Sequence, residues 1–348
     1  MQRSGQTSRF EGWVAVCDSI YVAGWAAAGS QGAPVRIKLN GREIAEVKPT
    51  VERPDVAATG RPALSGFVHV FEKPLAETDD LEVVFSDGTE LDWACRRFAC
   101  GKVATFPQPP TEFMGKVGDA DPNKFHMVGA HVFRMIRDKA GARPTDRILD
   151  IGSGCGRVAV YLSNYLNGLG RYDGFDIDLA MVEWCKENIT ARDQKFQFHH
   201  AKLTNTYYTE AGADAATYKF PFSDSTFDMV FAASVFTHLV PNSAQQYANE
   251  IARVLKPGGR ALLSFYVKND EFRRERAQGQ KHSLDFQYDH GDYSIVDEKH
   301  PELAIAFEEA LLRSIFDKAR LKIDTLSYGA WRKPGGWSFQ DWVLVSKS

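Results

Sequence analysis

Short apolar runs alternate with polar residues over roughly the first hundred positions of the chain. Trp13–Cys17 and Gly66–Phe71 are two such runs, and turn residues separate them from their neighbours. The pairs Asn40-Gly41 and Asp87-Gly88 each stand between alternating runs, and such pairs are the strongest short-range signal for a β-hairpin. This pattern predicts an antiparallel β domain over residues 1–105, organised as a small sandwich.

The apolar period becomes helical beyond residues 106–123, a stretch rich in proline, glycine and aspartate that we interpret as a linker. A helix is expected from Lys124 to about Gly141, since its apolar residues recur at the spacing of one helical face. A second domain is therefore predicted over residues 124–348. The residues that share the apolar face of its first helix are Phe125, Val128, Val132, Met135 and Ile136.

Strand-like and helix-like segments alternate through this second domain. Such alternation is typical of a parallel sheet with right-handed crossovers and helices on both faces, which is an α/β fold. Residues 322–329 and 340–347 have the pattern of a C-terminal antiparallel hairpin at one edge of the sheet. The helices are expected at residues 156–168, 179–191, 243–255 and 302–319.

Composition narrows the classes of protein without choosing among them. The chain has 348 residues, of which 44% are hydrophobic and 25% charged, as is usual for a globular protein of two domains. The formal net charge is -3, whereas a domain that binds nucleic acid usually carries a positive net charge. Residues 1–10 lack the apolar core of a secretory signal, no run is long enough for a membrane span, and the five cysteines lack zinc-binding spacing. We expect a cytoplasmic protein with reduced thiols, no nucleic-acid partner, no membrane span and no metal.

The segment RILDIGSGCGR, residues 147–157, contains the clearest candidate site. Gly152, Gly154 and Gly156 follow a predicted strand at alternate positions, where glycines let the backbone turn sharply and approach a ligand. The dinucleotide fingerprint is G-x-G-x-x-G, whereas this loop reads G-x-G-x-G and has Asp150 two residues before its first glycine. A carboxylate there would repel a pyrophosphate, but it can accept hydrogen bonds from a cationic amino group or help to hold the loop.

Four segments in order resemble the class I S-adenosylmethionine-dependent methyltransferases of the type 11/12-like group. They are ILDIGSGCGR, YDGFDID, FPFSDSTFDMVFAASVFTHL and IARVLKPGGRALLSFY, and they lie within residues 147–266. The resemblance implies a Rossmann-like, seven-stranded, mostly parallel sheet. It also implies methyl transfer from S-adenosyl-L-methionine without a metal.

The same resemblance implies a cofactor site. The glycine loop would wrap the methionine part and the ribose, and Asp176 would accept both ribose hydroxyls. Asp178, two residues further on, is expected to cap the following helix. Cys155 is expected to pack beneath the cofactor, because the sequence places no histidine or asparagine partner that would make it a nucleophile. Asp214 or backbone atoms would bind the adenine amino group, because Lys202 stands where relatives have an acid. An acidic side chain at the position of Asp176 also binds the ribose hydroxyls of NAD, so an NAD-linked oxidoreductase remains an alternative. The expected cofactor-binding residues are Asp150, Gly152, Ser153, Gly154, Cys155, Gly156, Asp176, Ile177, Asp214 and Ser234.

His238 is the candidate catalytic base for an acceptor hydroxyl, because it follows the fourth strand and an imidazole titrates near neutral pH. Packing at a helix end is the alternative role of this side chain. The stretch KHSLDFQYDHGDY after the fifth strand is either a lid over the acceptor or a solvated loop. The candidate substrate-binding residues are His282, Tyr288, His290 and Trp331, the last of which has packing in a hairpin as its alternative.

The first domain resembles a small β module attached to bacterial glycan-modifying enzymes, through its GWA, NG, RPDVA and GF landmarks. This resemblance implies a saccharide or glycolipid acceptor, such as a sugar hydroxyl of a surface polysaccharide or lipopolysaccharide. A small molecule, a lipid or a protein remains an alternative acceptor, because the fold does not choose among them. A module that binds without catalysis is a further alternative, and the oligomeric state is open.

Overall fold

The computed structural model describes residues 10–17, 21–73, 75, 79, 81–93, 106–166, 169–203, 212–279, 282–332 and 338–348. The chain forms two compact units, Met1–Thr105 and Phe106–Ser348. Among the described residues, no helix has both the length and the apolar character needed to cross a membrane.

The N-terminal unit is a β sandwich, which confirms the predicted class of this region. One sheet has the strand order β6-β7-β2-β1-β9, with β3 paired to β2, and the other has the order β5-β4-β8. Val22 and Phe67 of the first sheet pack against Ile37 and Phe85 of the second in one core. The elements are β1 (Phe10–Cys17), β2 (Tyr21–Ala28), β3 (Gln31–Gly32), β4 (Val35–Leu39), β5 (Arg42–Val47), β6 (Val51–Glu52), α1 (Pro54–Ala57), β7 (Leu64–Val70), β8 (Leu81–Phe85) and β9 (Asp92–Trp93).

The two predicted hairpin turns form. Asn40 and Gly41 both have positive φ and join β4 to β5, as a two-residue hairpin turn requires. After Asp87-Gly88 the chain returns along β8 through a single bridge between Val84 and Glu90. It then continues to β9, which pairs with β1 of the other sheet.

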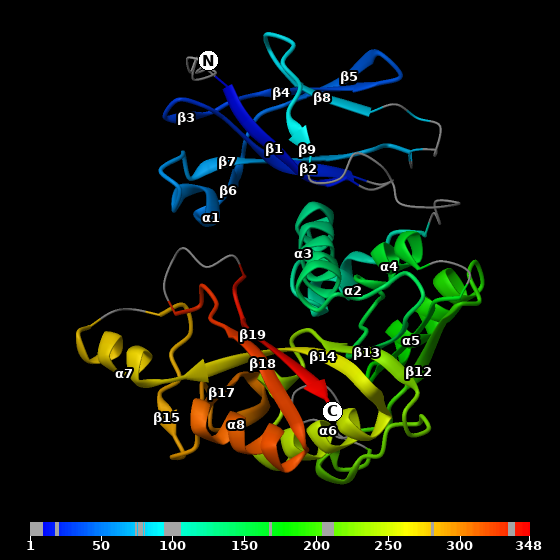
Figure 1. The fold of residues 1–348 in the computed structure, drawn as a ribbon, viewed down its shortest axis with the longest axis vertical. Coiled ribbons are helices and arrows are strands. Elements are labelled where there is room, and N and C mark those ends of the chain that lie inside the picture. The colour runs from blue at the N-terminus through cyan, green and yellow to red at the C-terminus, as the bar shows by residue number, and fades with distance from the viewer. Residues whose placement is uncertain are drawn as a thin grey trace, which may run out of the picture. The chain divides into compact units, whose positions relative to one another are not determined.

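The second unit is built on a mostly parallel sheet, as the α/β prediction requires (Figure 1). β19 lies antiparallel between β14 and β18, so the predicted C-terminal hairpin forms within the sheet. The strands run in the order β12 (Phe196–His200), β11 (Arg171–Asp176), β10 (Arg147–Ile151), β13 (Phe227–Ala232), β14 (Leu255–Lys268), β19 (Asp341–Lys347) and β18 (Leu321–Ser327).

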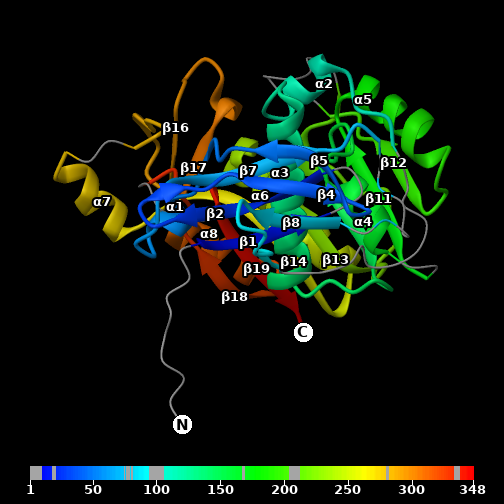
Figure 2. The same cartoon turned by 90° about the horizontal axis from the view of Figure 1, so that it is seen from above.

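Three short strands extend this sheet beyond the seven that were predicted. The last part of β14, Tyr266–Lys268, pairs with β17 (Ile305–Glu308), which continues through β16 (Tyr293–Ile295) to β15 (Tyr288–Asp289). Figures 1 and 2 show this extension and α7 (Asp270–Ala277) at one end of the unit, with β11 and β12 at the other. The predicted helix 302–319 was therefore wrong in its first half, because residues 305–308 pair with β14.

Helices cover both faces of the sheet. Adjacent strand residues such as Ile148 and Leu149 contact opposite cores, one shared with α3–α5 and the other with α6 and α8. The remaining helices and helical turns of the unit are α2 (Thr111–Lys116), α3 (Pro122–Arg134), η1 (Met135–Lys139), α4 (Ala159–Tyr165), α5 (Leu179–Cys185), η2 (Lys186–Thr190), η3 (Ala215–Thr217), η4 (Phe236–His238), α6 (Pro241–Val254), η5 (Pro301–Leu303) and α8 (Glu309–Lys318).

The stretch interpreted as a linker contains α2. Met114 of this helix is buried against Phe125, Cys155 and Met181 of the second unit. Its apolar side chain therefore anchors this part of residues 106–123 to that unit, in place of a solvated connection.

Candidate functional site

The glycine loop lies where the strand order of the sheet reverses. β10 has β11 on one side and β13 on the other, so the loop that leaves the carboxyl end of β10 opens at a topological switch point. Ligands of open α/β sheets bind in the crevice at such points.

Backbone geometry explains the three glycines of this loop. Gly152, Gly154 and Gly156 have φ of +75°, +51° and +78°, a region that side chains disfavour. A Cβ on Gly154 would also lie 2.6 Å from Val117 Cγ1, and one on Gly156 would lie 2.5 Å from Ile189 Cδ1. The loop is thus compact because its turns leave no room for a side chain at the glycine positions.

Gly156→Ala should therefore lower the free energy of unfolding by about 2–5 kcal/mol, through positive φ and an overpacked contact with Ile189. Gly258→Ala is the matched control, because Gly258 has φ +75° and open space around its Cα, so only the backbone cost of about 1–2 kcal/mol applies. Urea unfolding of both variants measures the difference. Equal losses in the two variants would contradict the packing argument.

Asp176 ends β11 and faces the glycine loop. Its Oδ2 accepts a hydrogen bond from Gly154 N at 2.7 Å, and its Oδ1 accepts one from Asp178 N at 2.9 Å. Burial raises the pKa of the Asp176 carboxyl, while these backbone donors favour its ionised form. Each oxygen keeps a further lone pair, so the carboxylate can accept two hydroxyl groups of a ligand.

Asp178 has the capping role predicted for it. Its Oδ1 accepts a hydrogen bond from Met181 N at 3.1 Å in the first turn of α5. Lys116 of α2 donates to the other oxygen, Oδ2, at 2.9 Å. This ion pair joins α2 to the start of α5 beside the glycine loop.

Asp150 lies at the end of β10 and is 2% exposed. The Tyr172 hydroxyl donates to its Oδ2 at 2.6 Å. Burial raises the pKa of the Asp150 carboxyl to about 7, so a cationic group placed beside it would favour the ionised form.

A cavity of about 370 Å³ opens between the glycine loop, the ends of β11 and β13, and η4. Its size lies within the range of small-molecule sites. At one end it is lined by apolar Ile177, Leu203 and Ala215. Of the residues predicted to act, the following line the cavity: Asp150, Gly152, Ser153, Gly154, Asp176, Ile177, Ser234 and His238.

Two serines on the cavity wall have unusual environments. Ser153 Oγ is buried and has no hydrogen-bond partner in the part of the chain that the structure describes, so it can bond to a ligand. Ser234 follows β13 with a φ of +62°, and its Oγ donates to Gln340 Oε1 at 3.1 Å. Positive φ at a residue other than glycine is typical of functional loops.

His238 lines the cavity at the end of η4. Its Nδ1 lies 2.8 Å from the Glu302 carbonyl oxygen, which can only accept, so Nδ1 carries the proton in the neutral ring and Nε2 has the lone pair. Burial lowers the pKa of His238 below its usual value, and backbone contacts with Glu302 and Leu303 oppose that shift. The ring is therefore neutral near pH 7.

Three residues predicted to bind the cofactor do not line the cavity. The Cys155 side chain is fully buried beneath the loop with Met114 and Phe125, and burial raises the pKa of its thiol to about 12. Gly156 faces Ile189 in the core. Asp214 is exposed, and its Oδ1 accepts a hydrogen bond from Ala216 N at 2.8 Å to cap η3. A short acid at a helix start is used here as a cap.

The four predicted substrate residues also lie away from the cavity lining. Trp331 is fully buried with Tyr266 and Phe272, and its Nε1 donates to Asp341 Oδ2 at 2.9 Å. His282 packs on the Phe272 ring, with 4.5 Å between ring centroids. Tyr288 is partly buried against the core that the sheet shares with α6 and α8. His290 is exposed and stacks on Tyr293.

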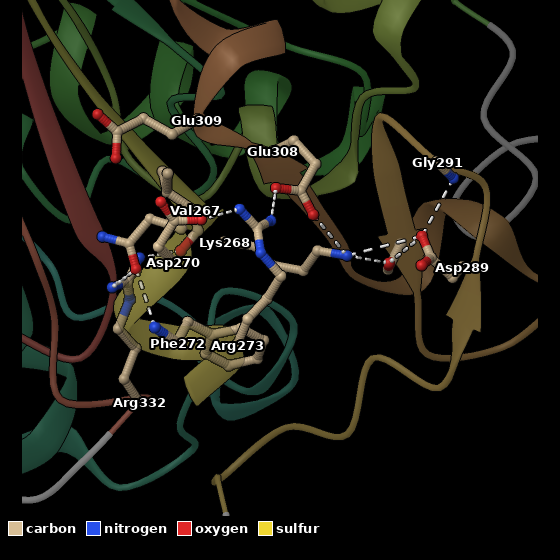
Figure 3. A network of polar contacts seen from close by, with 12 residues as sticks. Val267, Lys268, Asp270, Phe272, Arg273, Asp289, Gly291, Glu308, Glu309 and Arg332 are labelled. Atoms are coloured by element: carbon tan, nitrogen blue, oxygen red, sulfur yellow. Dashed lines mark hydrogen bonds and ion pairs between the residues drawn. The ribbon is translucent and has the colours of Figure 1, made fainter. Parts of the chain in front are cut away.

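The stretch that contains Tyr288 and His290 is held at the far end of β14. Lys268 Nζ donates to Ser294 Oγ at 2.6 Å and lies 3.0 Å from Glu308 Oε1 and 3.7 Å from Asp289 Oδ1 (Figure 3). These contacts join β14 to β15, β16 and β17. A buried ammonium group needs such partners, so this network anchors the extension of the sheet.

Several cavity residues were not predicted from the sequence. Lys116 and Arg157 are the unpredicted cations, and Arg157 Nη1 donates to Val117 O at 2.6 Å. Glu302 and Gln340 reach the same cavity from η5 and from the residue before β19. The apolar spacing of Phe113, Met114 and Val117 was the only local signal for α2.

Among the described residues, no group of three or more acidic, histidine or cysteine side chains could hold a metal.

Residues 149–263 match the model of a protein family that is described as a methyltransferase domain. The ubiquinone/menaquinone biosynthesis C-methyltransferase UbiE of Shewanella woodyi is 29% identical over 135 residues, which are 39% of this chain and 48% of that protein. UbiE of Francisella philomiragia is 31% identical over 130 residues, 37% of this chain and 46% of the relative. The chain therefore spans about half the length of these relatives.

A solved structure of an S-adenosylmethionine-dependent methyltransferase from Methanosarcina mazei is also similar. It has 20% sequence identity and a TM-score of 0.41, and the match covers 60% of this chain and 95% of that one.

Proposed function

We propose that this chain, which contains a class I S-adenosylmethionine-dependent methyltransferase domain, is an O-methyltransferase that methylates a sugar hydroxyl. The family match over residues 149–263 confirms the predicted class of the domain and its cofactor, S-adenosyl-L-methionine. One observation supports the proposal most directly. A single cavity is lined by the glycine loop and Asp176, which suit a nucleoside, and also by His238, whose ring is neutral.

The residues around the cavity fit the cofactor, which supplies a methyl group already activated on a sulfonium. Asp176 has the spare lone pairs for two ribose hydroxyls, and Ser153 Oγ has no hydrogen-bond partner among the described residues. Ile177, Leu203 and Ala215 offer an apolar surface for adenine. A further set of charged groups lines the same cavity and suits an amino acid moiety: Asp150 for the ammonium, and Lys116 and Arg157 for the carboxylate.

His238 is proposed as the general base. Its Nε2 takes the proton of the acceptor hydroxyl as the oxygen forms its bond to the methyl carbon and the carbon–sulfur bond breaks. The contact from Nδ1 to Glu302 O fixes the orientation and tautomer of the ring. The same contact stabilises the imidazolium that results.

A saccharide is the proposed acceptor. The landmarks of the N-terminal β sandwich and the polar side chains of Ser234, Gln340 and Glu302 on the cavity wall support it. The relatives named above are C-methyltransferases of quinone biosynthesis, so a small molecule is the alternative acceptor. A bacterial polysaccharide or lipopolysaccharide as partner, and a cytoplasmic location, stay predictions.

Calorimetry on ligand-free protein tests the cofactor part of this proposal. The full chain should bind S-adenosylhomocysteine and should not bind NADH, because Asp150 and the G-x-G-x-G spacing disfavour a pyrophosphate. Incubation with labelled S-adenosylmethionine and a panel of polysaccharides then tests the acceptor. Absence of S-adenosylhomocysteine binding would refute the proposed function.

A further inference from the structure

Phe339 is exposed although the backbone around it is fixed. Its side chain is 49% exposed. Trp331 N donates to Phe339 O at 3.0 Å, and Ala330 N donates to Ser338 O at 2.7 Å. Asp341 accepts from Gly329 N at 2.6 Å and so ties the same two segments together. Because its backbone is already held, this aromatic ring can contact a ligand without a further cost for ordering the segment.

Phe339 and the cavity wall share one neighbour, Tyr266. The rings of Phe339 and Tyr266 meet edge to face with 6.3 Å between centroids. Gln340 Nε2 donates to the Tyr266 hydroxyl at 3.4 Å, while Gln340 Oε1 accepts from Ser234 Oγ. Gln340 lines the cavity, so the exposed phenyl ring lies beside the part of the wall that Ser234 and Gln340 form.

Glu302 lines the same cavity. Its backbone oxygen holds His238, so its side chain and the proposed base come from contacting segments. The residues that line the cavity with His238 thus include Ser234 with a hydroxyl, Gln340 with an amide and Glu302 with a carboxyl group, and the aromatic Phe339 directly precedes Gln340 in the chain. A pyranose matches this combination, because it has an apolar face of C–H groups and an edge of hydroxyls. A quinol ring offers two hydroxyls at most and has no need of three polar side chains.

We propose that Phe339, Gln340 and Glu302 form a pyranose subsite for the acceptor. Phe339 stacks on the C–H face of the sugar ring, and Gln340 and Glu302 hydrogen-bond to its hydroxyls. The subsite turns one hydroxyl toward His238. This inference rests on the proposed function and gives the acceptor a chemical class and specificity-determining residues.

Saturation-transfer NMR on the full chain with S-adenosylhomocysteine tests the subsite. The probes are methyl α-D-glucopyranoside, methyl α-D-mannopyranoside, methyl β-D-galactopyranoside and methyl α-L-rhamnopyranoside, with hydroquinone as the competing ring. At least one pyranoside should receive saturation at its C–H groups. Phe339→Ala should weaken that binding about tenfold, and Phe339→Trp should retain it.

Leu169→Ala is the matched control, because Leu169 is a 75% exposed apolar residue outside the cavity lining. Its pyranoside signals should equal those of the wild type. The proposal is overturned if no pyranoside binds, if Phe339→Ala binds as tightly as the wild type, or if only hydroquinone binds. Calorimetry with S-adenosylhomocysteine on the same samples reports on the proposed function separately, and the pyranoside titration is repeated on the free protein.

Discussion

Asp176→Asn should weaken the binding of S-adenosylhomocysteine by at least about 100-fold. The amide keeps the size of the carboxylate but has only one acceptor oxygen. It therefore cannot accept from both Gly154 N and Asp178 N, which now donate at 2.7 and 2.9 Å, and also serve two ribose hydroxyls. Two charge-assisted hydrogen bonds of about 1.5–3 kcal/mol each account for the expected loss. Isothermal calorimetry measures it.

Asp173→Asn is the control for this prediction. Asp173 lies on the same strand, β11, but bonds to Arg147 and His199 and does not line the cavity. Its variant should bind S-adenosylhomocysteine within about twofold of the wild type, because the contacts that the change alters, to Arg147 and His199, lie outside the cavity lining. Affinity that stays unchanged in Asp176→Asn would remove Asp176 from the cofactor site.

His238→Asn should lower kcat by a factor of about 10² to 10⁴ on the acceptor identified with labelled cofactor. The asparagine amide can still donate to Glu302 O from the position of Nδ1, but the side chain has no basic nitrogen in place of Nε2. Binding of S-adenosylhomocysteine should not change. The variant thus separates the loss of a base from the loss of the site.

The pH dependence of the reaction gives His238 a second signature. Only the neutral ring can take a proton, so activity should fall as the pH decreases through the pKa of His238. Burial lowers that pKa, which places the loss below the usual histidine value of about 6.5. His238→Asn should lack this acid limb. His199→Gln, which changes a histidine outside the cavity lining, should keep it. An acid limb that persists in His238→Asn would assign the base elsewhere.

Local patterns in the sequence brought Asp150, the glycine loop and Asp176 to one cavity, and their role in cofactor binding stays a prediction. β10, the glycine loop and Asp176 lie in short contiguous segments. The backbone conformation and the position of each residue at a strand end determine which residue types occur there. A turn with positive φ needs Gly152, and a carboxylate at a strand end needs no distant partner to be recognised. Asp178 as the cap of α5 was predicted for the same reason.

The same local patterns misplaced residues whose role depends on distant neighbours. The sequence around Trp331 looks like an exposed turn, yet Tyr266, Phe272 and the acceptor oxygen of Asp341 bury the indole. Residues 305–308 lie in an apolar run that favours a helix, but β14 extends far enough to pair with them. Hydrogen bonds to a partner strand override helical propensity there.

The sequence by itself determined the fold class, the hairpin turns and the position of the glycine loop, because hydrophobic period, turn residues and motif spacing act over a few positions. Only the tertiary structure decided which side chains share the cavity. Lys116, Glu302 and Gln340 meet the glycine loop from segments far along the chain. Cys155, adjacent to two glycines of that loop, is turned into the core. Such neighbours follow from the packing of whole elements, which residue spacing does not encode.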